Sequence, residues 1–127
     1  MKTEIKYIEQ KTGYSDNGPA WIGKVKLSSS GQTVYFNDKG FKKCRGISGN
    51  YYDIETQDEY WISGVKKDGT DRHWAGSGKI FIDKSVISEY LEIIDKDELD
   101  VKKFVVIDIP DTYPIERITS LENSKKS

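Results

Sequence analysis

The chain has 127 residues, with 20 basic and 21 acidic side chains, one cysteine and a formal net charge of −1 at pH 7. This length fits a single domain over 1–127, and the lone cysteine excludes an internal disulfide framework. The balanced net charge favours no particular class of partner. The sequence has neither a signal-peptide pattern nor the ~20 consecutive apolar residues of a membrane helix, so we expect a cytoplasmic protein without membrane contact.

Residues 5–82 predict a series of short strands separated by polar turns. From Trp21 to Leu27, apolar and polar residues alternate with the period of a half-buried strand. Asp68-Gly69 is a tight-turn signal, and Gly76-Ser77-Gly78 indicates a bulge or a sharp bend. Strands are expected at 5–10, 21–27, 33–37, 41–44, 50–55, 59–65, 72–75 and 79–82. The sequence therefore predicts a mainly β protein, a small antiparallel open barrel or strongly curved sheet of SH3-like style.

The hydrophobic period changes at Asp83. Apolar side chains at positions 86, 87, 90, 91 and 94 have helical spacing, and Asp83 is a suitable N-cap. One short amphipathic helix is therefore expected from about Lys84 to Ile94, packed over the sheet. Phe104 to Ile109 predicts one more strand, with two buried faces. Residues 115–127 are expected to form a polar, partly frayed tail with a weak helical pattern at its start.

Asp71 and His73 are the strongest candidates for chemistry. On a strand they share one face, while Arg72 and Trp74 share the other. A carboxylate two residues from an imidazole can orient it as a general base. No recognisable nucleophile accompanies the pair, and one histidine near one aspartate is common by chance. We therefore predict no catalysis, and a small hydrolase or nuclease using His73 is the second alternative.

Cofactor and metal sites have little support in the sequence. Gly76-Ser77-Gly78-Lys79 resembles part of a phosphate loop, but the full motif requires a glycine at position 73 and a helix after Lys79. A structural zinc site needs about four Cys or His ligands, and the chain has only Cys44 and His73. The acidic residues of 95–100 lack the spacing of a calcium loop. We expect neither a cofactor nor a bound metal.

Charge is distributed unevenly along the chain. Residues 20–46 contain six basic residues and one acidic residue, and residues 83–100 contain seven acidic and two basic residues. A basic meander with interleaved aromatic residues is typical of small barrels that bind single-stranded nucleic acid. The other explanation is that the two segments pack together, with the aromatic residues in the core. The nucleic-acid alternative depends on Lys24, Lys26, Lys42, Lys43 and Arg45.

The hairpin of residues 50–65 places aromatic residues on both of its faces. One face must be core, so the other leaves Tyr or Trp beside acidic residues, as in a protein–protein hot spot. Stabilisation of the sheet by residues of high β-propensity explains the same pattern equally well. The predicted binding residues are Tyr52, Tyr60, Trp61, Arg72, His73 and Trp74. The leading functional prediction is a non-catalytic module that binds a protein partner, as an inhibitor or immunity-type factor.

Several segments resemble a family of small uncharacterised bacterial proteins. These segments are GPAWIG at 18–23, SGQTVYF at 30–36, EYWISG at 59–64 and DRH at 71–73. The resemblance covers about residues 5–109. It implies a module of this size and no particular activity.

Overall fold

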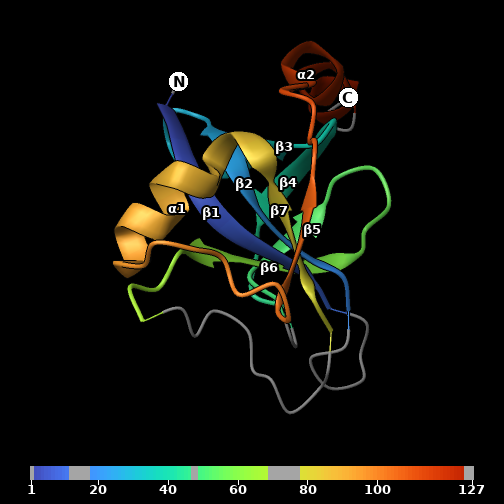
Figure 1. Cartoon of the computed structure of the whole chain (residues 1–127). Helices are drawn as coiled ribbons and strands as arrows, with labels where there is room; N and C mark the ends of the chain where they lie inside the picture. Colours follow the sequence, from blue (N-terminus) through green and yellow to red (C-terminus); the bar gives the residue numbers. More distant parts are fainter. Residues whose placement is uncertain (1, 12–17, 47–48, 69–77, 125–127) are drawn as a thin grey trace.

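The computed structural model describes residues 2–11, 18–46, 49–68 and 78–124. Within this part of the chain, eight strands form one sheet in the order β1-β6-β5-β4-β3-β2-β7-β8, and β1 also pairs with β2 (Figure 1). The β1–β2 pairing closes six antiparallel strands into a small barrel, to which β7 and β8 are added. The predicted fold class, a mainly β protein with a small barrel, is confirmed.

The elements follow the expected turns closely. The strands are β1 Lys2–Gln10, β2 Ala20–Leu27, β3 Thr33–Phe36, β4 Lys39–Lys43, β5 Tyr51–Asp53, β6 Glu59–Gly64, β7 Ile80–Asp83 and β8 Phe104–Ile107. The helices are the 3₁₀ turn η2 Lys84–Val86, α1 Ile87–Ile94 and α2 Ile115–Ser124. The expected strand at 72–75 and the expected bend at 76–77 lie outside the described residues.

Strand β2 separates the barrel from the added strands. It pairs with β1 along its whole length, while its first three residues pair with β7 and its last two with β3. Gly23 lies between the residues that pair with β7 and those that pair with β3. A Cβ atom there would be 2.6 Å from Cε1 of Phe36, so glycine is needed for the Phe36 ring to fill the barrel interior.

Strands β7 and β8 run parallel to β2 and to each other, which the sequence did not indicate. A parallel pair needs a crossover, and η2 and α1 provide it between β7 and β8. The expectation of a strand with two buried faces at 104–109 is wrong. Strand β8 ends at Ile107 and is the edge of the sheet, so Val106 is 49% exposed.

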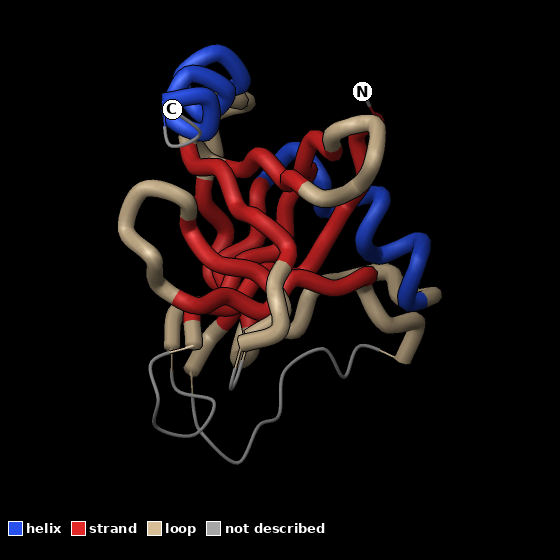
Figure 2. The backbone as a smooth tube through the Cα atoms, turned by 180° about the vertical axis from the view of Figure 1, so that it is seen from behind, coloured by secondary structure: helices blue, strands red, loops and turns tan. Residues whose placement is uncertain are grey.

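Three apolar clusters hold these elements together. The first fills the barrel, and each of the others lies between the outer surface of the sheet and one helix, α1 or α2, on different sides of the barrel (Figure 2). The barrel cluster consists of Ile8, Val25, Val34, Phe36, Phe41, Tyr60, Ile62 and Ile109. The cluster under α1 consists of Tyr7, Ala20, Ile22, Ile80, Ile82, Val86 and Tyr90. The cluster under α2 consists of Tyr35, Ile54 and Ile118.

The start of the first helical segment confirms the predicted N-cap. Asp83 is 4% exposed, and its Oδ1 accepts a hydrogen bond from the Ser85 N–H at 3.1 Å. The same oxygen lies 3.5 Å from the donor N–H of Ile109, which follows β8. Asp83 therefore both caps η2 and holds the chain after β8 beside it.

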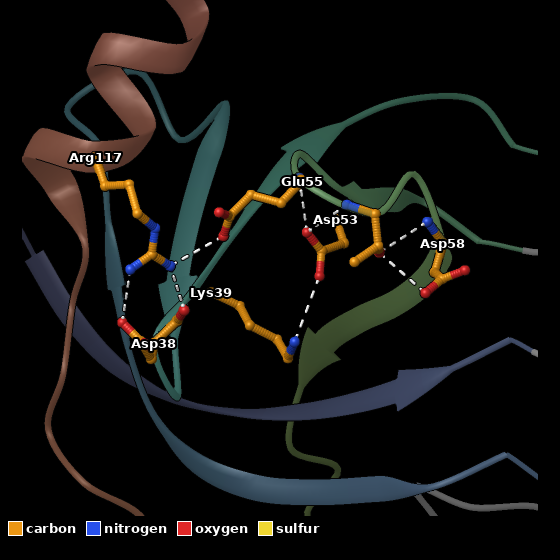
Figure 3. Close-up of polar contacts among 7 residues, drawn as sticks. Asp38, Lys39, Asp53, Glu55, Asp58 and Arg117 are labelled. Atoms are coloured by element: carbon orange, nitrogen blue, oxygen red, sulfur yellow. Dashed lines mark hydrogen bonds and ion pairs between the residues drawn. The ribbon is translucent and has the colours of Figure 1, made fainter.

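The segment beginning at Ile115, where the sequence indicated only a weak helical pattern at the start of a polar tail, forms helix α2. Ile118 is fully buried against the sheet. The Arg117 guanidinium donates to Oδ1 and the carbonyl of Asp38, at 3.0 and 2.7 Å, and to Oε1 of Glu55, at 2.9 Å (Figure 3). These contacts join the helix to two turns of the barrel. Packing against the barrel, rather than helix propensity, orders this polar segment.

Candidate functional site

The outer face of β6 carries an exposed tryptophan. Tyr60 and Ile62 point into the barrel, so the alternation of the strand directs Trp61 outward. Trp61 is 41% exposed, although it lies within a strand that pairs with β1 on one side and β5 on the other. The apolar clusters under α1 and α2 lie elsewhere on the outer surface of the sheet and do not include Trp61.

Glu9 is the cross-strand partner of Trp61, and its carboxylate is almost fully buried. The hydroxyl of Tyr7 donates to Oε1 of Glu9 at 2.5 Å, and Nζ of Lys11 donates to Oε2 at 2.9 Å. Both carboxylate oxygens therefore have charge-assisted or hydroxyl donors, as a buried carboxylate requires. This cluster gives Trp61 a rigid polar border on β1.

On its other side, β6 lies beside β5. Tyr52 is the cross-strand partner of Glu59, so both side chains project from the outer surface of the hairpin. Tyr52 is half-buried and packs against the cluster under α2. We call Glu9, Tyr52, Glu59 and Trp61 the β6 face. It places the exposed indole of Trp61 beside the carboxylates of Glu59, on the same strand, and Glu9, on β1.

Tyr60 does not belong to the β6 face, and its position corrects its assignment as a binding residue. Its ring lies inside the barrel, 4.6 Å from the Phe41 ring centroid. Burial raises the pKa of Tyr60 to about 12, and the nearby carboxylates of Asp53 and Asp58 add to this shift. The Tyr60 side chain is therefore part of the core. The remaining predicted binding or catalytic residues, Asp71, Arg72, His73 and Trp74, lie outside the described residues.

The residues of the nucleic-acid alternative lie on different sides of the molecule. Lys42 forms an ion pair with Glu122 of α2 at 3.2 Å, and the ammonium of Lys26 lies 4.9 Å from the Tyr113 ring centroid. Lys24 instead lies near α1, beside Glu89. Lys43, the last residue of β4, and Arg45, two residues later, are exposed.

The aromatic side chains of the basic segment are also largely withdrawn from solvent. Tyr35 is buried under α2, and Trp21 is half-buried against the barrel core with its ring centroid 6.3 Å from that of Phe81. Stacking on a nucleic-acid base requires an open ring face. Tyr35 and Trp21 therefore leave little open ring surface for stacking on bases.

The Tyr7, Glu9 and Lys11 cluster was not recognised from the sequence. Tyr7 and Glu9 of β1 and Lys11, the residue after the strand, stand at alternating positions and therefore share one face. The sequence does contain this signal. The burial of Glu9 depends on the pairing of β1 with β6, which is a non-local contact. The sequence alone therefore did not distinguish this carboxylate from the other glutamates.

No family model, curated protein or solved structure matches this chain. Among the described residues, no group of three or more His, Cys, Asp or Glu side chains is arranged to hold a metal ion. The helices of the described segments are too short or too polar to cross a membrane.

Proposed function

We propose that this protein is a non-catalytic module that binds a protein partner through the β6 face, with Trp61 at the centre of the contact. The exposure of Trp61 within a doubly paired strand is the observation that carries this proposal. Tryptophan is enriched among hot-spot residues because burying its ring removes about 150–250 Å² from water.

The rigidity of the β6 face supports binding as its role. The backbone of Trp61 pairs with Glu9 of β1, and the preceding residue, Tyr60, pairs with β5. The buried Glu9 carboxylate is held by Tyr7 and Lys11. A preorganised surface loses little conformational entropy when a partner binds. Much of the free energy gained by burying an aromatic ring on such a surface is therefore retained in the free energy of binding.

A cytoplasmic inhibitor or immunity-type factor is the role that we propose for this module. Such a factor acts by occupying the surface of another protein and needs no catalytic group of its own. The resemblance to small bacterial proteins over residues 5–109 is part of the same proposal. Candidate partners are proteins with a pocket that accepts an indole ring.

Affinity capture from a nuclease-treated native cytosol tests this function. The wild-type protein, Trp61→Ala and the control Val106→Ala are immobilised in parallel, because Val106 is an exposed apolar residue on β8, away from β6. We expect the wild type and Val106→Ala to capture the same protein. Loss of a hot spot of about 2 kcal/mol should weaken binding to Trp61→Ala about 30-fold.

Binding measurements with the purified partner then decide whether the β6 face is the binding surface. Once the captured protein is identified, its affinity for the three immobilised proteins is measured by titration, and circular dichroism verifies that each variant is folded. Equal affinity for Trp61→Ala and the wild type would contradict the β6 face as the binding surface. Reproducible turnover of a substrate that depends on His73 would contradict a purely binding role.

A further inference from the structure

The first half of β1 has an unpaired edge among the described residues. Strand β1 pairs with β2 over residues 2–9, but it pairs with β6 only over residues 6–10. Strand β6 ends at Gly64, opposite Lys6. Within the part of the chain that the structure describes, residues 2–5 therefore have a neighbouring strand on one side only.

The backbone groups of Thr3 and Ile5 point toward this unpaired edge. In an antiparallel ladder the N–H and C=O of one residue point to the same neighbour, and the direction alternates along the strand. The N–H of Lys11 donates to the carbonyl of Glu59 on β6. The N–H of Gln10 donates instead to the carbonyl of Pro19, on the β2 side. The backbone groups of odd-numbered residues of β1 thus face the β6 side. No described strand lies opposite Thr3 and Ile5 there.

A groove of about 400 Å³ follows this edge and reaches α1. Its apolar surface comes from β1, from the residue after β6 and from the last turn of α1, and charged side chains border it. The lining residues are Thr3, Glu4, Ile5, Lys24, Val65, Glu89 and Ile93. An apolar side chain beside an unpaired strand edge would therefore find both a hydrophobic surface and backbone partners.

The charges around the groove differ in their availability. Glu4 forms ion pairs with Lys2 at 2.7 Å and with Lys6 at 3.1 Å, so its charge is compensated. Lys24 and Glu89 form no side-chain ion pair with another described residue. The groove consequently offers one ammonium and one carboxylate to an occupant that carries charges of both signs.

We propose that an extended peptide segment of a protein partner adds to the edge of β1 as a further strand. Its backbone pairs with Thr3 and Ile5, an apolar side chain lies against Ile5 and Ile93, and an acidic side chain reaches Lys24. Main-chain hydrogen bonds supply affinity and the groove supplies sequence preference, as in other cases of strand addition.

This inference rests on the proposed function in one respect, that the partner is a protein. Val65 follows Trp61 by four residues along the chain that leaves β6. At about 3.3 Å per residue, the groove lies roughly 13 Å from the β6 face. One partner can therefore contact both surfaces, with Trp61 in a pocket and a peptide segment at the β1 edge.

Selection of a displayed library of random heptapeptides tests the edge site. Thr3→Pro is the blocking variant, because proline removes the N–H that faces the edge and leaves the β1–β2 hydrogen bonds intact. Thr3→Ala is the matched control, since it keeps the N–H and removes only the side chain. We expect peptides selected on the wild type to bind Thr3→Ala and Trp61→Ala equally well and to bind Thr3→Pro at least tenfold more weakly.

The alternative outcomes separate the two proposals. A selection that enriches no peptide, or peptides that bind Thr3→Pro as well as the wild type, would overturn the edge site. Self-association of the wild type that Thr3→Pro abolishes would overturn it in favour of a second copy of this chain. Peptides that lose affinity for Trp61→Ala and retain it for Thr3→Pro would overturn the edge site while supporting the β6 face.

Discussion

Ile118 of α2 lies directly over Gly40 of β4. A Cβ atom at position 40 would be 2.6 Å from Cγ1 and 2.8 Å from Cδ1 of Ile118, closer than side-chain carbons approach. Both residues are buried, and Tyr35 and Ile54 complete the apolar cluster around Ile118. The position of α2 therefore depends on the absence of a side chain at one point of the barrel.

Gly40→Ala should lower the free energy of unfolding by about 1–3 kcal/mol, because Ile118 or the whole helix must shift to admit the methyl group. Gly64→Ala is the control, since a Cβ atom there meets nothing within 4 Å. Urea denaturation measures both variants. In the double variant Gly40→Ala/Ile118→Ala, the two costs should be less than additive, and full additivity would contradict the contact.

The Arg117 contacts of Figure 3 should contribute much less than this packing. Hydrogen bonds with Glu55 and Asp38 raise the pKa of Arg117, but its side chain is 42% exposed. Solvent screening limits exposed ion pairs to about 1 kcal/mol or less. Arg117→Ala is therefore expected to lower the free energy of unfolding by less than Gly40→Ala in the same urea experiment. A larger loss would show that Arg117, and not Ile118, holds α2 in place.

Stability at high pH should depend on Tyr60. Its pKa is raised from 10.0 to about 12 by burial, so the unfolded chain loses the phenol proton at a lower pH than the folded chain. The resulting stabilisation is complete below pH 10 and is lost as the pH rises through about 12. Two pKa units set an upper limit of about 3 kcal/mol, which solvent screening reduces.

Tyr60→Phe tests this dependence directly. Urea unfolding of the variant should show a fall in the free energy of unfolding between pH 9.5 and 11.5 that is smaller than that of the wild type by at least about 1 kcal/mol. Burial also raises the pKa values of Tyr35, Tyr51 and Tyr113, so part of the fall should remain. Identical pH profiles for the variant and the wild type would contradict the assignment to Tyr60.

The sequence predicted those parts of the fold that depend on local signals. The meander from Ala20 to Lys43 and the hairpin around Thr56 combine alternating apolar residues with turn residues, and both formed as expected. The helical period from Val86 to Ile94 was equally clear. The parallel pairing of β7 and β8 was not predicted, because no local sequence signal identifies the partner of a strand that is distant in the chain.

Helix α2 and the candidate site show the same limit. Ile115, Ile118 and Leu121 recur at a spacing of three, but the segment is polar overall, and it is ordered by contacts with Gly40 and with Asp38. The sequence suggested an exposed aromatic residue in the hairpin of 50–65 without deciding which face was outside. The register of β6 against β1 makes that choice, and it also buries Glu9.

Trp61 should contribute little to the stability of the folded chain, in contrast to an interior aromatic residue. Trp61→Ala is expected to lower the free energy of unfolding by less than about 1 kcal/mol, because a large part of the indole already contacts water. Phe41→Ala is the comparison, since Phe41 is 1% exposed within the barrel cluster, and its loss should cost about 3–5 kcal/mol.

Urea denaturation at pH 7, followed by far-ultraviolet circular dichroism, measures both substitutions without depending on tryptophan fluorescence. Near-native stability of Trp61→Ala combined with loss of partner capture would assign the indole to recognition. If Trp61→Ala cost as much as Phe41→Ala, the ring would be part of the structural core, and weaker capture by that variant would reflect unfolding. A tryptophan kept at a surface position where folding does not need it is then best explained by the contact that it makes with another protein.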